Sequence, residues 1–536
     1  MTTFNAWRDP WVPLQDRNGE QIRLSLRDTF VRAHDLAGLG AGLTPLDRDS
    51  LYRFLPSVGA VILRLVGDDA LPNEGEDEGW SFPEEAVDQF GALYEERFEL
   101  TGDRPFLQRW DRKHADLEAL FSLDVADPKV RRGREKARSE KLQSLHMLHP
   151  HTPGGSSSQW AVRRDTRDET QCAELTLLLV TTWFQTKHGN SKDPWGHKSL
   201  KGSAGTWHVN PFAVHLTDPR SLARTLCANM PYAWIDGRND LPLFLDHESL
   251  PRDFATAHVA SVTRFTYAKT LPLVYVEDGA PVGFVIGEDP GIPVPGLGKD
   301  DKTSLGMVHE FDHTRLYLEQ KSGDLKPRGA FGVRLTTTEG FERWFRAENQ
   351  IRAALDRWAR TDRVLTVSSS QKKDWLYSLY SDNGNTHGNR EFAAWDELPA
   401  DVAGASGDAL ERVRSLLTLA AQCRNTFGYA MKLATGDSRI PPAAEAGQAA
   451  FYAGLVPVLA AVAHAVHEGE EVDMRSHALA LLRIARREFD RTTAPMLVPS
   501  AVARVAHARA EFARLIAKAC AQHFPAPASS PEQETS

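Results

Sequence analysis

The hydrophobic residues of the chain follow a helical period in four consecutive segments beyond residue 400. These segments are rich in alanine, leucine and arginine and are separated by glycine or proline; they cover residues 408–433, 443–467, 472–491 and 499–522. In the last one Val505, Phe512 and Ile516 fall on one face, while charged residues lie off it, as is typical of an amphipathic helix. Four such helices joined by short connections predict an all-α four-helix bundle over residues 401–524.

The hydrophobic pattern of residues 1–400 is irregular, with strand-like, helical and loop segments in alternation and no internal repeat. Three long stretches are rich in glycine, serine, proline or other loop residues, at residues 149–158, 188–206 and 287–306. Stretches of that length in a compact domain either carry function or are disordered. The pattern therefore predicts an α+β, mixed fold class. We expect a large irregular α/β domain over residues 1–400, then the bundle, then a disordered tail over residues 525–536.

The first thirty residues predict a β-hairpin that leads into a helix. A short apolar run at residues 11–14 is followed by Asn18-Gly19, a pair that supplies the positive φ angles of a tight turn. Apolar and polar residues alternate again on the return strand, at residues 22–24. Ser25 then stands where a helix N-cap is expected.

Composition and charge narrow the class of protein. The 536 residues exceed what one hydrophobic core supports and indicate two or three domains. The net charge of −9 argues against a generally basic nucleic-acid binder, so any such contact has to come from local patches. No apolar run approaches the ~20 residues of a membrane span, and the N-terminus lacks a secretory pattern, so we expect a cytoplasmic protein. The four cysteines form no CxxC pair, which favours reduced thiols, and we expect neither a metal nor a cofactor.

Four segments spaced over nearly the whole chain carry a family resemblance. They are Asp9–Pro13 together with Asn18-Gly19 and Ser25–Arg27, the segment Arg104–Gln108, the segment Tyr377–Trp395, and the segment Arg487–Ile516. In this order they resemble the large subunit (CasA family) of the type I-E CRISPR Cascade surveillance complex. Ordered matches of this kind are more specific than any one of them alone.

The resemblance implies a target-recognition subunit without catalysis of its own. In that family the N-terminal domain recognises the protospacer-adjacent motif (PAM) in double-stranded DNA from the minor-groove side, through a glycine-rich loop, a lysine finger and a wedge. The wedge starts the strand separation that leads to an R-loop, and the subunit provides the docking surface for a helicase-nuclease. The partners implied are the CRISPR RNA-containing Cascade subunits, double-stranded target DNA and the helicase-nuclease, with no membrane. A few minor-groove contacts suit a short, permissive motif, because guide base pairing supplies the rest of the specificity.

The glycine loop of the family is best matched by Pro194–Gly205. Its glycines permit close backbone approach and its lysines can meet phosphates; the DNA-binding candidates are Gly196, Lys198, Lys201, Gly202 and Gly205. An ordinary exposed loop with two solvated lysines is the alternative.

The wedge is matched by Ser381–Asn389, with Asn383, Gly384 and Asn385 at its tip. Asn-Gly closes a tight turn, and an amide side chain can replace the hydrogen bonds of a separated base pair. A plain hairpin turn is the alternative.

The resemblance implies two further contact sites. Lys302, with Lys299 as the second choice, is placed as the lysine finger, although Asp300 and Asp301 between them repel phosphate. The loop at 148–160 stands where the family engages the backbone subunits and the 5′ end of the guide RNA. His149 and His151 are its candidate contacts, or else ordinary solvated loop residues.

Two basic stretches remain outside these assignments. Residues 127–141 hold seven basic and three acidic side chains, which indicates either a solvated helix face or a phosphate contact blind to sequence. A row of arginines at helical spacing lies on the third predicted helix of the bundle, at Arg483, Arg486, Arg487 and Arg491. The family resemblance assigns the bundle contacts to DNA and to small subunits, and solubility is the alternative.

An enzyme and a pure scaffold are the rival classes. The segment His309–His313 packs four possible metal ligands into five residues, which suggests a metal-dependent nuclease. The flanking alternation at 315–318 is that of a strand, however, and would place the two histidines ~13 Å apart, too far to share one ion. No phosphate-binding loop, dinucleotide fingerprint or Gly-x-Ser-x-Gly motif is present in the sequence. We therefore expect no enzymatic activity, and we keep a structural scaffold without direct DNA reading as the alternative.

Overall fold

The computed structural model describes residues 4–66, 71, 79–148, 171–185, 194–195, 212–218, 221–236, 240–246, 262–268, 270–292, 317–319, 325–327, 364, 374–381, 392–399, 408–439, 441–467 and 470–525. The chain divides into two compact units. The first comprises Met1–Ala330, Arg352–Gln371 and Leu376–Trp395, and the second comprises Phe331–Ile351, Lys372–Trp375 and Asp396–Ser536. The domain limits expected from the sequence, at residues 400 and 524, stay predictions.

A three-stranded antiparallel sheet in the order β2-β1-β3 opens the first unit. Its strands are β1 (Val12–Asp16), β2 (Gln21–Leu24) and β3 (Leu36–Leu39). Gly19 has a φ of +86° in the turn between β1 and β2, where a side chain would be strained. Ser25 caps α1 (Leu26–Val31), because its hydroxyl accepts a hydrogen bond from the amide of Asp28 at 3.0 Å. The predicted hairpin and helix start are confirmed.

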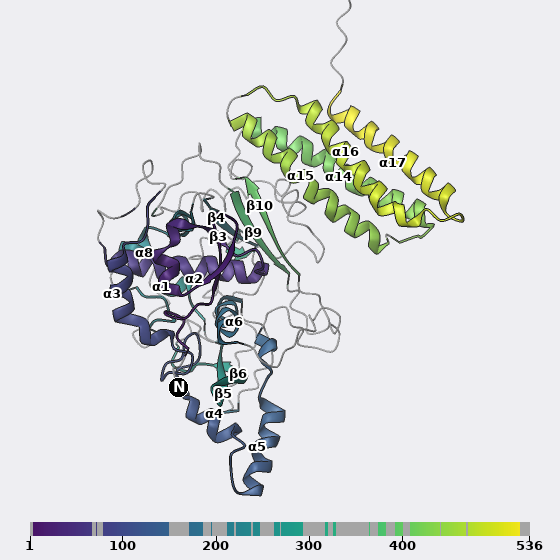
Figure 1. The fold of residues 1–536 in the computed structure, drawn as a ribbon. Coiled ribbons are helices and arrows are strands. Elements are labelled where there is room, and N and C mark those ends of the chain that lie inside the picture. Colours follow the sequence, from purple (N-terminus) through teal and green to yellow (C-terminus); the bar gives the residue numbers. More distant parts are fainter. Residues whose placement is uncertain are drawn as a thin grey trace, which may run out of the picture. The chain divides into compact units, whose positions relative to one another are not determined.

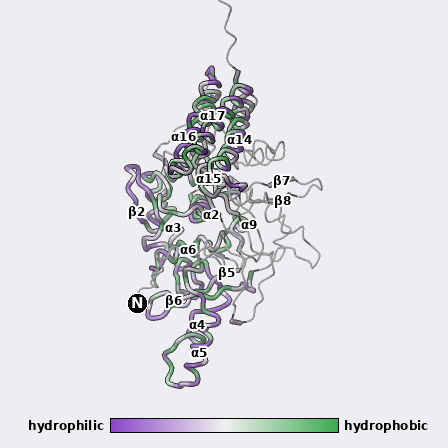
Figure 2. The backbone as a smooth tube through the Cα atoms, turned by 90° about the vertical axis from the view of Figure 1, so that its right-hand side faces the viewer, coloured by the Kyte–Doolittle hydropathy of each residue, from purple (hydrophilic) through white to green (hydrophobic). Residues whose placement is uncertain are grey.

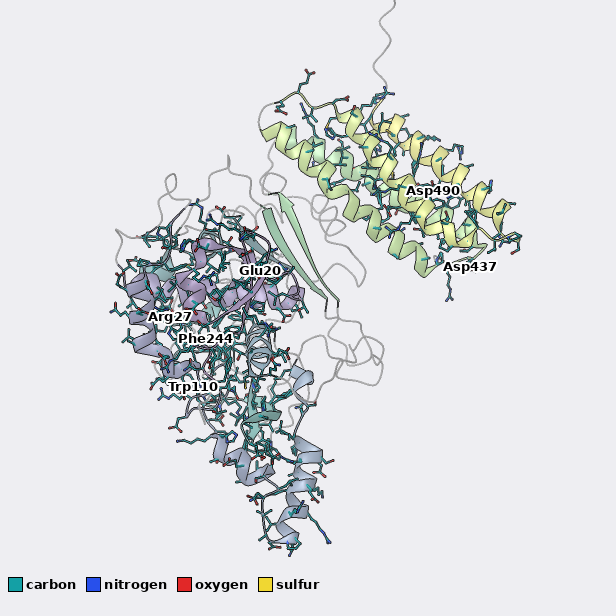
Figure 3. The ribbon with its side chains drawn as sticks, in the orientation of Figure 1. Glu20, Arg27, Trp110, Phe244, Asp437 and Asp490 are labelled. Atoms are coloured by element: carbon teal, nitrogen blue, oxygen red, sulfur yellow. The ribbon has the colours of Figure 1, made fainter. Side chains whose placement is uncertain are left out.

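Helix α2 (Pro45–Arg64) is largely buried in the core of the first unit. Its N-terminus is closed by a capping box between Thr44 and Asp47. The ring centroid of Phe54 in α2 lies 5.8 Å from that of Phe106 and 5.1 Å from that of Phe244, which is labelled in Figure 3. Several polar side chains of this helix, among them Asp49 and Arg53, are buried as well, and they need partners inside the protein.

Short helices surround α2 and complete this core. The helices that contact it are α3 (Glu84–Tyr94), α6 (Cys172–Gln185), α7 (Leu222–Ala228) and α8 (Ala233–Asp236). The unit also holds α9 (Val262–Phe265) and the 3₁₀ helices Ala33–Asp35, Glu95–Phe98 and Leu145–Leu148.

The segment Arg104–Gln108, one of the four resembling segments, joins two parts of the first unit. Phe106 and Leu107 are each 1% exposed and belong to the core. The buried amide of Gln108 donates to the carbonyl of Leu100 at 2.9 Å and accepts from the amide of Val274 at 2.7 Å. The segment thereby ties strand β5 to the core.

A hairpin and two helices form a satellite at one end of the first unit, where Figure 1 shows them side by side. They are β5 (Thr270–Glu277), β6 (Ala280–Glu288), α4 (His114–Phe121) and α5 (Pro128–Lys141). Asp278 and Gly279, both with positive φ, make the two-residue turn of the hairpin. A small separate core fills the satellite; its buried members are Leu117, Phe121, Leu273, Tyr275 and Val285.

The remaining strands form two further sheets. One has the order β10-β9-β4, from β4 (Phe212–Thr217), β9 (Asp374–Ser381) and β10 (Phe392–Pro399). The other pairs β7 (Tyr317–Glu319) with β8 (Leu325–Pro327).

Four long helices pack together in the second unit (Figure 1). They are α14 (Asp408–Thr435), α15 (Pro442–His467), α16 (Met474–Thr493) and α17 (Val502–His523), with a 3₁₀ turn at Ala494–Met496. Purple and green alternate along α16 and α17 in Figure 2, as the amphipathic pattern requires. Phe427, Phe489 and Phe512 meet at the centre, with centroid distances of 4.4 to 5.6 Å.

The predicted fold class is confirmed, since a mixed helix-and-sheet part is followed by a helical C-terminal region. The predicted apolar stripe of α17 is confirmed as well, because Val505, Phe512 and Ile516 are at most 1% exposed. Among the described residues, none of the helices combines the length and the apolar character that a membrane span requires.

Candidate nucleic-acid interface

All site residues expected from the sequence lie outside the described residues. They are the glycine-loop residues Gly196, Lys198, Lys201, Gly202 and Gly205, the wedge residues Asn383, Gly384 and Asn385, the finger lysines Lys299 and Lys302, and the guide-loop residues His149 and His151. Their roles stay predictions. The structure does describe the residues from which each segment starts, and these flanks define the candidate interface.

The wedge segment connects two neighbouring strands of one sheet. Strand β9 ends at Ser381, two residues before Asn383, and β10 begins at Phe392. The two strands are hydrogen-bonded to each other. A segment that has to enter a duplex needs a stiff support, and a pair of strands provides one.

The same sheet includes the strand that follows the glycine loop. Strand β4 begins at Phe212, seven residues after Gly205, and it is the other hydrogen-bonded neighbour of β9. The strand after one expected DNA-contacting segment therefore lies beside the strand before the other, although about 160 residues separate β4 from β9 in the sequence.

A buried polar cluster fixes β4 to α2. His215 of β4 lies with its Nε2 2.5 Å from Oδ1 of Asp49, and Nε of Arg53 lies 3.1 Å from Oδ2 of the same carboxylate. None of the three side chains is more than 1% exposed. Burial of a carboxylate and a guanidinium is tolerated only when they are paired, so the cluster specifies one position of β4 on α2.

The far end of β4 is held by α7 and the residue that follows it. The side chain of Asn229 accepts from the amide of Leu216 at 3.0 Å and donates to the carbonyl of Leu216 at 2.7 Å. Just beyond the strand, Asp218 pairs with Arg224 at 2.9 Å, and both are 2% exposed. Strand β4 is therefore anchored along its length by side chains.

The N-terminal side of the glycine loop is fixed at Trp195. The guanidinium groups of Arg112 and Arg109 lie 5.1 and 5.4 Å from the centroid of its ring. Arg109 is itself oriented by two hydrogen bonds to Asp111, both of 2.7 Å. Trp195 also packs against the satellite core. Gly196 follows directly in the sequence, so the loop starts from an anchored residue.

The finger and guide-loop segments also start from anchored residues. Asp289 accepts hydrogen bonds from the amides of Trp110 at 2.9 Å and Gly291 at 2.8 Å, and the fully buried Ile292 follows (Trp110 is labelled in Figure 3). Lys299 stands seven residues further on. At the guide loop, Thr182 donates to the carbonyl of Leu148 at 3.1 Å, and His149 is the next residue.

The two basic stretches are described. Residues 128–141 form α5, which has no buried residue. On α16, the side chains of Arg487 and Arg491 are 67% and 80% exposed and flank Glu488, which is 6% exposed; Nε of Arg487 lies 2.8 Å from that carboxylate. The arginine row of α16 therefore lies on an exposed face.

Sequence reasoning did not single out the buried cluster or Trp195. Asp49 and Arg53 stand four residues apart in a helix, a spacing that is compatible with an ion pair, but the spacing alone does not show that the pair is buried. Within the described ranges no group of three or more histidine, cysteine or acidic side chains is arranged to hold a metal. The segment His309–His313 lies outside those ranges.

Comparison with family models matches residues 5–265 to the CRISPR-associated protein Cse1. Comparison with curated proteins gives no match. Among solved structures, Cse1 from Acidimicrobium ferrooxidans superposes with a TM-score of 0.63 at 18% identity, over 98% of this chain and all of that one. Thermobifida fusca Cse1 gives 0.66 at 16% identity, over 97% of this chain and 98% of that one.

A chain of a structure described as a CRISPR RNA-guided surveillance complex gives a TM-score of 0.57 at 17% identity, over 96% of this chain and all of that one. These likenesses establish the fold over nearly the whole chain. Residues 5–265 are thus similar to the Cse1 (CasA) family of CRISPR-associated proteins, and nearly the whole chain shares the fold of solved Cse1 structures.

Proposed function

We propose that the chain is the non-catalytic target-recognition subunit of a type I-E CRISPR effector complex. In this role it recognises the PAM in double-stranded DNA and starts strand separation for R-loop formation. The match of residues 5–265 to the Cse1 family model supports the role, and the matched chain in a CRISPR RNA-guided surveillance complex supports CRISPR RNA-containing subunits as partners. The helicase-nuclease as a third partner and a cytoplasmic location follow from the same role.

The pairing of β4 with β9 is the observation that carries this proposal. It joins β4, which begins eleven residues after Lys201, to β9, which ends two residues before Asn383. Reading of a motif and opening of the adjacent base pair have to occur at neighbouring positions of the same duplex. A single sheet that is anchored to α2 and adjoins both proposed contact segments meets that requirement. A rigid sheet keeps the proposed wedge in position while it separates stacked bases.

Selection from a randomised motif library tests this function. We expect the complex assembled with this chain to enrich targets that carry a short motif beside the guide-matched sequence, and the complex assembled without it to enrich none. A scaffold role predicts instead that both complexes bind all flanking sequences equally. That outcome would contradict PAM recognition by this chain.

Catalytic activity of the purified chain is the test of its non-enzymatic nature. We expect no cleavage of single- or double-stranded DNA and no ATP hydrolysis with Mg²⁺, Mn²⁺ or Zn²⁺. In the expected strand, His309 and His313 would lie too far apart to bind the same metal ion. Metal-dependent cleavage that disappears in the variant His309→Ala, His313→Ala would establish the nuclease alternative.

A further inference from the structure

Helix α5 concentrates positive charge in an acidic protein. Its 14 residues include seven basic and two acidic side chains, whereas the net charge of the whole chain is −9. The helix buries none of its residues, so hydrophobic packing does not explain its composition. Like charges three and four residues apart destabilise a helix by roughly 0.2–0.5 kcal/mol per pair. The excess of positive charge is therefore not explained by the stability of the helix alone.

One face of α5 is bound to the rest of the satellite. Arg134 donates to the carbonyl of Ser122 at 2.8 Å, and Nη2 of Arg138 lies 2.6 Å from Oε2 of Glu277. The guanidinium of Arg138 also lies 5.4 Å from the ring centroid of Tyr275. Partial burial opposes the charge of Arg138, but the hydrogen bonds and charges of Glu277 and Tyr275 outweigh it, so the pKa of Arg138 is raised. Arg134 and Arg138 therefore hold α5 against the rest of the satellite.

The C-terminal end of α5 is locked to strand β6. Gln143 and Phe284 exchange backbone hydrogen bonds of 2.8 and 2.9 Å. The close approach requires glycine at position 283, because a Cβ there would lie 2.7 Å from the carbonyl oxygen of Gln143. The orientation of α5 relative to β6 is therefore fixed. The face of α5 that points away from Arg134 and Arg138 then has a fixed direction as well.

That opposite face, here called the α5 outer face, consists of Lys129, Arg132 and Lys136. Spacings of three and four residues place the three side chains in one row, and all are exposed. Lys129 and Arg132 have no ion-pair partner among the described residues. Lys136 lies 3.8 Å from Glu140, but both side chains are more than half exposed, and such pairs contribute little. The row extends ~10 Å along the helix axis.

The satellite core connects α5 to the start of the glycine loop. Ala137 and Leu142 pack against this core from the α5 side, and Trp195 packs against the same core directly before Gly196. The α5 outer face and the N-terminal side of the glycine loop are therefore supported by one small rigid assembly.

We infer that the α5 outer face binds the phosphate backbone of the duplex DNA that flanks the PAM. The inference rests on the proposed function and adds a holding surface to the motif-reading loops. Lysine and arginine on a fixed helix neutralise phosphates without reading bases. One strand of a duplex carries a phosphate about every 3.4 Å along its axis, so a ~10 Å row matches about three of them.

Salt-dependent binding of the assembled complex to duplex DNA tests the inference. The variant Lys129→Ala, Arg132→Ala, Lys136→Ala should lower the slope of log K against log salt by ~2 to 3, at ~0.9 per phosphate contact. Preference for one motif over another should not change. The matched control Arg17→Ala, Arg23→Ala, Arg32→Ala removes three exposed cations elsewhere in the same unit, and it should leave the slope unaltered.

The outcomes separate this inference from the proposed function. An unchanged slope in the α5 variant, with motif preference intact, overturns the inference and leaves PAM recognition standing. An equal loss in the control variant also overturns it, because the effect is then one of net charge. Absence of duplex binding by the unaltered complex overturns both. Equal thermal melting of the three proteins shows that the exposed substitutions leave the fold intact.

Discussion

Replacement of Asp49 by alanine should lower the free energy of unfolding of the first unit by ~3–5 kcal/mol, because the buried Arg53 and His215 both lose their shared carboxylate. Arg53 cannot release its proton, so its charge stays in the core. Urea titration followed by tryptophan fluorescence measures the effect as a lower midpoint of the transition of this unit.

Asp88→Ala is the matched control for this prediction. Asp88 is 54% exposed and pairs with Arg27, which also pairs with Glu84, so its loss should cost less than ~1 kcal/mol. The double variant Asp49→Leu, Arg53→Met should recover part of the loss, because it removes the buried cation together with the anion. If Asp49→Ala costs no more than Asp88→Ala, the cluster does not hold β4 on α2.

The parts of the fold that could be predicted from the sequence depend on local patterns. The hairpin at the N-terminus followed from Asn18-Gly19 and from the cap at Ser25, both of which act within a few residues. The helices of the second unit followed from apolar periodicity, which marks the buried face of each helix whatever it packs against. These signals do not depend on contacts with remote parts of the chain.

The arrangement of the candidate site could not be predicted in the same way. The pairing of β4 with β9 and the contact of Asp49 with His215 join residues that are more than 150 positions apart. No local pattern specifies such a partner. For α5, the charge count was visible in the sequence, but the division into an anchored face and an outer face depended on Glu277 and on the approach to Gly283.

The segment Arg104–Gln108 shows how a family motif can have a structural reason. The sequence offered it only as part of a resemblance. In the structure, Gln108 satisfies the carbonyl of Leu100 and the amide of Val274, and both contacts are buried. Its role is to fix β5, the strand that carries two members of the satellite core, Leu273 and Tyr275.

The variant Asn383→Gly, Asn385→Gly should slow strand opening by the assembled complex and spare the initial binding of the duplex. The amide side chains are proposed to replace hydrogen bonds of the first separated base pair, and glycine has no group to do so. Opening can be followed by the fluorescence of a base analogue placed beside the motif.

The variant Lys198→Ala, Lys201→Ala should behave differently, because it removes proposed phosphate contacts. It should weaken binding to all duplexes and lower the salt slope by ~1 to 2.

The most direct test of the central claim compares the wedge variant on a matched target and on a target already mismatched beside the motif. A mismatch removes most of the separation cost, which is ~1.4 kcal/mol per base-pair step in a matched duplex. The account predicts that opening of the mismatched target by Asn383→Gly, Asn385→Gly returns to the rate of the unaltered complex. An equal loss of rate on both targets would contradict it, and residues 381–389 would then have no role in opening the duplex.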